Sequence, residues 1–185
     1  MIKGIFVGIL LTVIGIAAIV YSYFSTGRAP VAVSDSDIPF ESTLAHMALN
    51  TYLNKLPHRS PPIPIDESNM LAGAKLYKEH CSVCHGVPDA PKSTIAEGMY
   101  PKPPQLFKGM GVTDDEPWES YWKVNGGIRM SGMPEFKNHL SEDQMWQLAL
   151  LVKNADKISP AVKAELTGNP PPAAATPVPP AQKKN

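Results

Sequence analysis

"KLYKEHCSVCHGVP", residues 75–88, contains both cysteines of the 185-residue chain, Cys81 and Cys84, and a histidine, His85, directly after the second. Two thiols separated by two residues occur in redox dithiols, in halves of metal sites, in short disulfides and at points of covalent cofactor attachment. The rest of the sequence discriminates among these chemistries.

The composition excludes a polyelectrolyte partner. Seventeen acidic residues balance seventeen basic ones, and charged residues make up 18% of the chain. A nucleic-acid-binding protein would carry a basic stripe, and none is present. The 20 prolines cluster at 57–64 and 160–180, where they indicate spacers. The length fits one modest domain with extensions.

The N-terminal segment is apolar enough to cross a bilayer. Residues 4–24 carry no charge, and as a helix they would span about 31 Å, close to the ~30 Å hydrocarbon core. The run exceeds the roughly 7–15 residues of a signal-peptide core, and Tyr21, Tyr23 and Phe24 close it as an interfacial aromatic belt. We predict an uncleaved anchor in the lipid bilayer rather than a cleaved signal. The charge bias places the N-terminus in the cytoplasm and everything beyond residue 27 outside.

These patterns divide the chain into four segments. Residues 1–24 are the anchor or signal peptide, and 25–65 form a linker with a short helix at 41–56. Residues 66–158 are the globular unit. Residues 159–185 form a Pro/Ala-rich disordered tail, since they lack core-forming content.

The globular unit is predicted to be all-α, because no alternating strand pattern occurs in it. One helix runs from about Asp66 to Cys81. A second follows the residues 113–117 and ends at 125–127. A third begins at Ser141, which forms a capping box with Gln144. So small a core requires an additional stabilising element, and a large apolar cofactor would provide one.

The cysteine motif then has one preferred interpretation. The βαβ pattern expected around a redox dithiol is absent, and a structural zinc site requires four ligands, of which only half are present. A disulfide would leave His85 without a role. The sequence C-x-x-C-H is the attachment signature of c-type haem, in which two thiols one helical turn apart reach two vinyl groups and the histidine binds iron. We therefore predict one haem c, covalently bound through Cys81 and Cys84 and ligated by His85.

The chain also resembles a known family. "LAGAKLYKEHCSVCHG", "YPKPPQLF", "YWKVNGGIRMSGMPEF" and "LSEDQMWQLALLV" are similar, in this order, to segments of the class I (monohaem) cytochrome c family, here in membrane-anchored form. The similarity covers about residues 66–158. It implies a few helices around one haem, the first and last crossing almost perpendicularly. Gly73 and Tyr77 would then face Trp146 and Leu150.

The resemblance also assigns the remaining haem contacts. In this family the methionine of a Gly-Met-Pro sequence is the second axial ligand, which is Met133 here. Met130 and then His139 are alternatives, and Met99 and Met110 are further candidates. Pro104 would accept the hydrogen bond from His85, with Leu106 packed on the ring. Weaker candidates for propionate contacts, or for ordinary core positions, are Tyr100, Trp118, Trp122 and Arg129.

Histidine and methionine together leave no open position on iron, which is typical of an electron carrier rather than an enzyme. The predicted protein is a monohaem cytochrome on the periplasmic face of the bacterial inner membrane, exchanging single electrons with membrane redox complexes or another cytochrome. An alternative is a fixed subunit of a quinol-oxidising or terminal oxidase complex, held partly by the 41–56 helix. An enzyme or sensor whose iron loses its methionine, and a scaffold without haem, are the other hypotheses.

Overall fold

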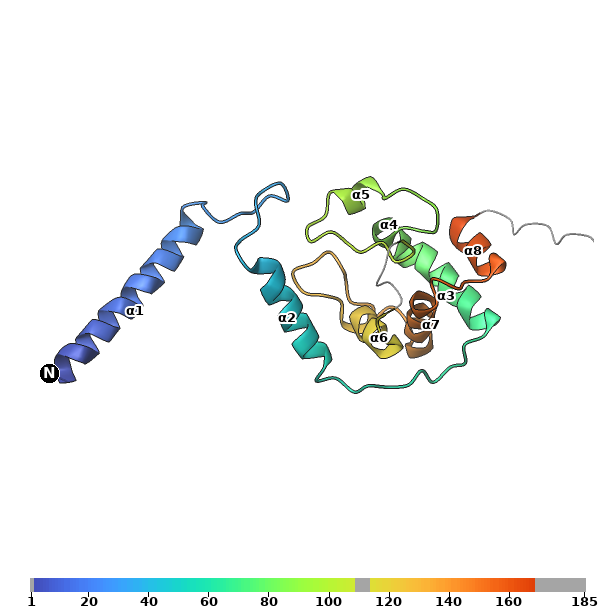
Figure 1. Cartoon of the computed structure of the whole chain (residues 1–185), viewed down its shortest axis with the longest axis horizontal. Coiled ribbons are helices and arrows are strands. Elements are labelled where there is room, and N and C mark those ends of the chain that lie inside the picture. The colour runs from blue at the N-terminus through green and yellow to red at the C-terminus, as the bar shows by residue number, and fades with distance from the viewer. Residues whose placement is uncertain (1, 109–113, 169–185) are drawn as a thin grey trace, which may run out of the picture. The chain divides into compact units, whose positions relative to one another are not determined.

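The computed structural model describes residues 2–108 and 114–168, and no strand occurs among them. The prediction of an all-α fold is therefore confirmed for these residues (Figure 1). The chain divides into two compact units, Met1–Ala48 and Leu49–Asn185. The helices are α1 (Ile2–Ser25), α2 (Glu41–Leu53), α3 (Glu67–His80), α4 (Ser82–His85), α5 (Thr94–Glu97), α6 (Pro117–Gly126), α7 (Glu142–Lys153) and α8 (Pro160–Thr167).

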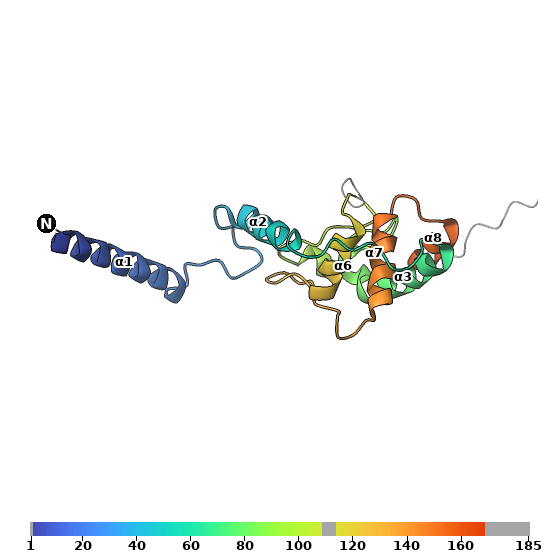
Figure 2. The ribbon, with the colours of Figure 1, turned by 90° about the horizontal axis from the view of Figure 1, so that it is seen from below.

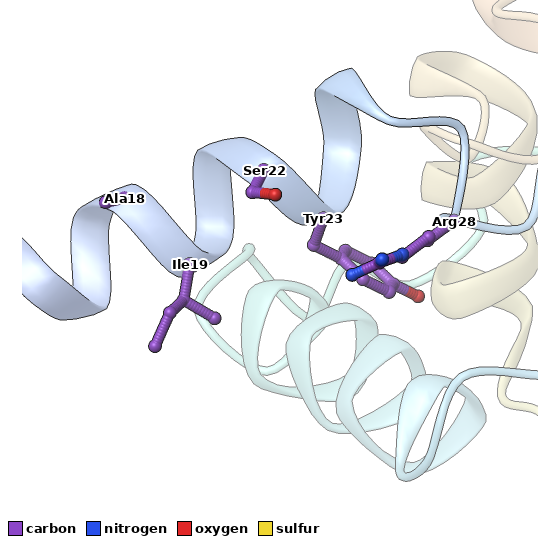
Figure 3. Close-up of a pocket in the computed structure, with 5 residues that line it drawn as sticks. All are labelled: Ala18, Ile19, Ser22, Tyr23 and Arg28. Carbon is purple, nitrogen blue, oxygen red and sulfur yellow. The ribbon is translucent and has the colours of Figure 1, made fainter.

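Helix α1 is the one helix in the described part of the chain that is long and apolar enough to cross a membrane. None of its side chains is buried. At its C-terminal end, Ala18, Ile19, Ser22, Tyr23 and Arg28 line an open pocket (Figure 3). Apolar side chains thus give way to an aromatic ring and a cation within three turns, which is the residue order of a membrane interface. A cleaved signal sequence shares the apolar composition of this helix.

The predicted helices of the globular unit are present with nearly the predicted bounds. Asp66 caps α3 by accepting a 2.8 Å hydrogen bond from the Asn69 N–H. Ser141 and Gln144 form the predicted capping box of α7. Helix α2 ends three residues earlier than predicted, at Leu53, whose side chain is buried.

The core lies where α7 crosses α3 and packs along α6 (Figure 2). Gly73 permits the crossing, since a Cβ atom there would lie 2.5 Å from the backbone oxygen of Gln147. The close approach agrees with the prediction, and the atoms nearest to Gly73 belong to Gln147 and Leu151. Trp146 is fully buried and stacks on Tyr121 of α6, with 4.4 Å between the ring centroids.

Part of the predicted linker packs on the domain. The indole N–H of Trp122 donates a 3.1 Å hydrogen bond to the Pro57 carbonyl, and the His58 ring stacks on Trp118 with 3.9 Å between centroids. Arg59 lies over the Tyr121 ring, 5.6 Å from its centroid, and pairs with a carboxylate of α7. Trp118 and Trp122 therefore support this segment. Because its indole N–H is already bonded, Trp122 is not a propionate donor, which corrects that expectation.

The domain also extends beyond the predicted boundary at residue 158. Helix α8 begins inside the segment that we expected to be a disordered tail, and it buries Val162 and Leu166 against α3. Its polar face forms ion pairs with the domain, Lys78 to Glu165 at 2.7 Å and Lys163 to Asp89 at 2.6 Å. Residues 169–185, the rest of the predicted tail, lie outside the described residues.

Replacing Gly73 by alanine tests the crossing of α3 and α7. The new methyl group would meet backbone atoms of Gln147, which cannot move aside as a side chain can. We expect the free energy of unfolding to fall by about 1–3 kcal/mol despite the better helix propensity of alanine. Urea unfolding of the full chain measures it. Gly126→Ala is the control, because nothing lies within 4 Å of a Cβ at Gly126. Equal stability of the two variants would contradict the close contact.

Candidate haem site

The C-x-x-C-H segment forms a single turn of helix directly after α3. The N–H groups of Cys84 and His85 donate to the Cys81 carbonyl at 3.1 and 2.9 Å. Both cysteines are free thiols and both are partly buried. The turn thus carries two unlinked thiols three residues apart, as attachment to one edge of a porphyrin requires.

The electrostatic environment of Cys81 differs from that of a reactive thiol. Burial, together with the neighbouring Cys84, raises the pKa of the Cys81 thiol to about 12. Redox-active cysteines have a lowered pKa, because the thiolate is the reactive species. The local structure therefore disfavours the dithiol interpretation.

The tautomer and charge of the His85 ring suit it to bind a metal. Its Nδ1 lies 2.8 Å from the Pro104 carbonyl oxygen. A carbonyl only accepts, so Nδ1 carries the proton and Nε2 presents a lone pair. Burial lowers the pKa of His85 and the hydrogen bond to Pro104 partly opposes this effect, so the ring is neutral at pH 7. The predicted contact with Pro104 is present.

Three further hydrogen bonds hold the turn in place. The Leu106 N–H donates to the His85 carbonyl at 3.1 Å, and the Gln105 side chain donates to the Cys84 carbonyl at 2.9 Å. The Tyr77 hydroxyl donates to the Gly86 carbonyl at 2.8 Å. Gly86 has φ +72°, and a Cβ there would lie 2.4 Å from Gln105 Oε1. The backbone conformation therefore favours a glycine at this position, and a side chain there would also displace the flexible end of Gln105.

Met133 lies in the loop between α6 and α7, which is closed by its own hydrogen bonds. The Ile128 N–H donates to the Met133 carbonyl at 3.1 Å, and the Met133 N–H donates to Ser131 Oγ at 3.2 Å. Gly127 has φ +64°, and a Cβ there would come within 2.7 Å of the Glu135 N atom. The chain after this glycine is thus fixed in a narrow turn that carries Met133 near its end.

The alternative ligands lie in different surroundings. The Met130 side chain is 92% exposed, and His139 is exposed as well. Met99 touches the loop of Met133, because a Cβ on Gly132 would lie 2.0 Å from Met99 Cε. Met110 lies outside the described residues. Among these side chains, Met133 is the partly buried methionine within the loop itself.

No three His, Cys, Asp or Glu side chains among residues 2–108 and 114–168 converge as a metal-ion site. Cys84 and His85 are adjacent on a helical turn, and their side chains point in different directions. The motif is therefore unsuited to chelating one bare ion. Two thiols on one turn and an imidazole with a free Nε2 instead fit a porphyrin attached at its edge and ligated at its iron.

Comparison with known proteins agrees with this geometry. Residues 68–152 match the family model of the cytochrome c oxidase, cbb3-type, subunit III. These residues form a class I cytochrome c domain. The matched range begins in α3 and ends in α7, so it includes the whole C-x-x-C-H turn and the loop that carries Met133.

Two individual proteins are similar to this cytochrome domain. The quinohemoprotein alcohol dehydrogenase ADH IIB of Pseudomonas putida is 27% identical over 97 residues, which are 51% of this chain and 12% of that enzyme. A chain of the reducing HAO-like protein complex of Kuenenia stuttgartiensis is 28% identical, with a TM-score of 0.44. That match covers 54% of this chain and 50% of the other. The chain therefore spans about half or less of the length of either relative.

Sequence reasoning missed the side chains that hold the haem-attachment turn from outside. Tyr77 was assigned to the helix crossing, yet its hydroxyl also reaches Gly86, and its ring packs edge-on against Phe107 at 5.1 Å. Gln105 had no assigned role. The sequence contained a signal for it, since a glycine directly after the histidine indicates that a neighbour approaches closely.

Replacing Tyr77 by phenylalanine tests the bond to Gly86. The ring and its packing would remain, but the Gly86 carbonyl would lose its donor in a part-buried place. We expect a loss of about 1–2 kcal/mol in the free energy of unfolding. Urea unfolding of the haem-loaded chain measures it, with Tyr52→Phe as the control, since the Tyr52 side chain is 60% exposed. A Tyr77→Phe variant as stable as the control would contradict the role of this hydroxyl.

Proposed function

We propose that the protein carries single electrons through one haem c, bound covalently by Cys81 and Cys84 and ligated by His85 and Met133. The observation that carries the proposal is the arrangement of His85. Its Nδ1 proton is bonded to Pro104, and its Nε2 lone pair is available to a metal. Two free thiols followed directly by a histidine held in this way match the donor set of a haem-attachment site.

The haem supplies an iron atom that exchanges one electron reversibly. The residues of the chain determine how this happens. The hydrogen bond to Pro104 fixes the tautomer and orientation of His85 and increases its basicity. Met133 would provide a soft thioether, which favours the reduced iron and raises the reduction potential. If His85 and Met133 both bind the iron, the site would have no position for a substrate.

Rigid ligands suit this role. The turn that carries His85 is braced from Tyr77, Gln105 and Leu106. The loop of Met133 is braced by Ser131 and by the tight turn at Gly127. Groups held in this way change position little when the charge on the iron changes. Because the ligands need to move so little, the barrier to transferring an electron is low.

The proposed location is the periplasmic face of the bacterial inner membrane. The support is α1, with its 24 residues and its aromatic end, together with the proposed covalent attachment of haem, which we expect outside the cytoplasm. The anchor would keep the cytochrome domain close to membrane redox complexes or to another cytochrome. The mass of the mature chain distinguishes this anchor from a cleaved signal, since cleavage would remove the segment before residue 25.

A fixed subunit of an oxidoreductase complex is the second candidate. Two findings favour it: the matching family is described as subunit III of a cbb3-type oxidase, and the Pseudomonas putida relative is an alcohol dehydrogenase of which the matched part is 12%. Extraction in mild detergent separates the two candidates. A complex subunit would co-purify with larger chains, whereas a free carrier would migrate alone.

Replacing Met133 by alanine tests the ligand set. A sulfur bound to ferric haem iron produces a weak charge-transfer band at the red edge of the optical spectrum. We expect Met133→Ala to lose this band entirely, to shift its reduction potential downward and to bind carbon monoxide when reduced, because one axial position is then open. Optical spectra of the haem-loaded chain during a reductive titration measure all three effects.

Met130→Ala is the matched control. Met130 lies three residues away in the same loop, but its side chain is 92% exposed, so its loss should leave the spectrum unchanged. A band that persists in Met133→Ala and disappears in Met130→Ala would assign the ligand to Met130. Carbon monoxide binding by the unmodified reduced protein would instead support the sensor or enzyme hypothesis.

A further inference from the structure

Met99 makes a specific contact with the loop of the proposed ligand. Its terminal methyl lies so close to Gly132 that a Cβ on this glycine would be 2.0 Å from Met99 Cε and 3.7 Å from Sδ. Met99 is partly buried, and Gly132 directly precedes Met133. The absence of a side chain at Gly132 therefore creates the space that the Met99 thioether fills.

The backbone of Met99 is connected to the haem-attachment turn. The Ser93 hydroxyl donates a hydrogen bond to the carbonyl of Val83, the residue directly before Cys84. The same hydroxyl caps α5 by accepting from the Ala96 N–H at 3.0 Å. Helix α5 then ends at Glu97, and the Gly98 N–H donates back to Thr94 at 3.1 Å. Met99 follows immediately, so its position is fixed relative to the two cysteines.

The loop of Met133 is closed by internal hydrogen bonds and is joined to α6 at its C-terminal end. Hydrogen bonds between Ile128, Ser131 and Met133 close the loop, and the Phe136 and Lys137 N–H groups donate to the Val124 and Asn125 carbonyls of α6 at 3.1 and 3.3 Å. These bonds fix the shape of the loop and tie it to α6, but none of them reaches the segment that carries His85. The contact of Met99 with Gly132 supplies a connection between the loop and the segment that starts at the cysteines.

We infer that Met99 is a positioning residue for the methionine ligand: by packing against Gly132 it holds Met133 within bonding distance of the haem iron. The inference rests on the proposed function, in which Met133 is that ligand. A methionine suits the task because its long, unbranched side chain adapts to an irregular gap. Met99 acts here through its volume, and its sulfur remains unbound to the iron.

Binding of imidazole to the ferric, haem-loaded full chain tests this role. Imidazole can reach the iron only when the methionine ligand leaves, so its apparent affinity reports how firmly the loop is held. Met99→Ala removes the packed atoms and so loosens the loop that carries Met133. We therefore expect the affinity for imidazole to rise about tenfold. Met99→Leu keeps most of the volume without the sulfur, and its affinity should stay within about twofold of the unmodified protein.

A double variant tests the contact itself. In Gly132→Ala the new methyl would occupy the place of Met99 Cε and push this flexible side chain aside. Combined with Met99→Ala, the same methyl would fill part of the space that Met99 leaves. We therefore expect the double variant to bind imidazole more weakly than the two single effects added together would predict. Met130→Ala is the control, because it changes the same loop at an exposed side chain.

The outcomes separate this inference from the proposed function. If Met99→Ala binds imidazole like Met130→Ala, Met99 does not position the loop, while loss of the charge-transfer band in Met133→Ala would still support the ligand. If Met99→Leu loses the band and Met133→Ala keeps it, the sulfur of Met99 is the ligand and both proposals are wrong. Should Met99→Ala fail to accumulate with haem, Met99→Val provides the same measurement, and an affinity unchanged from the unmodified protein would overturn the inference.

Discussion

The hydrogen bond between His85 Nδ1 and the Pro104 carbonyl is the constraint on which the site depends. It assigns the proton to one ring nitrogen and leaves the other free, and it fixes the plane of the ring. The bond also ties the C-x-x-C-H turn to residues 104–106. Within this segment, Gln105 and Leu106 donate hydrogen bonds to the carbonyls of Cys84 and His85. A short turn with few buried residues of its own is thereby held rigidly against the rest of the domain.

The helices supply the frame for this platform. Gly73 allows α3 to approach the backbone of α7, and the buried Tyr77 extends from the same helix to the turn that follows the cysteines. The crossing of two helices and the geometry of the attachment turn are therefore coupled through one helix. Helix α8 and residues 57–59 pack around this frame, so the folded unit is larger than the segment that matches the cytochrome family.

Local signals in the sequence were sufficient for the helices and for the cysteine motif. Asp66 and the Ser141–Gln144 pair mark helix starts through short-range hydrogen bonds, and the spacing of Cys81, Cys84 and His85 is typical of haem attachment. Contacts between distant segments were harder to predict. Proline-rich composition concealed the packing of Pro57 on Trp122, and the two buried residues of α8 were too few to distinguish it from the tail. The partner of Gly132 likewise became visible only in three dimensions.

The central claim is that both thiols are bonded to one haem. The most direct test is the intact mass of the denatured protein, made in cells that mature c-type haem. A mass equal to the polypeptide plus one haem, lost when both cysteines are replaced by serine, is the result that this account predicts. A colourless protein with the mass of the bare polypeptide would contradict it.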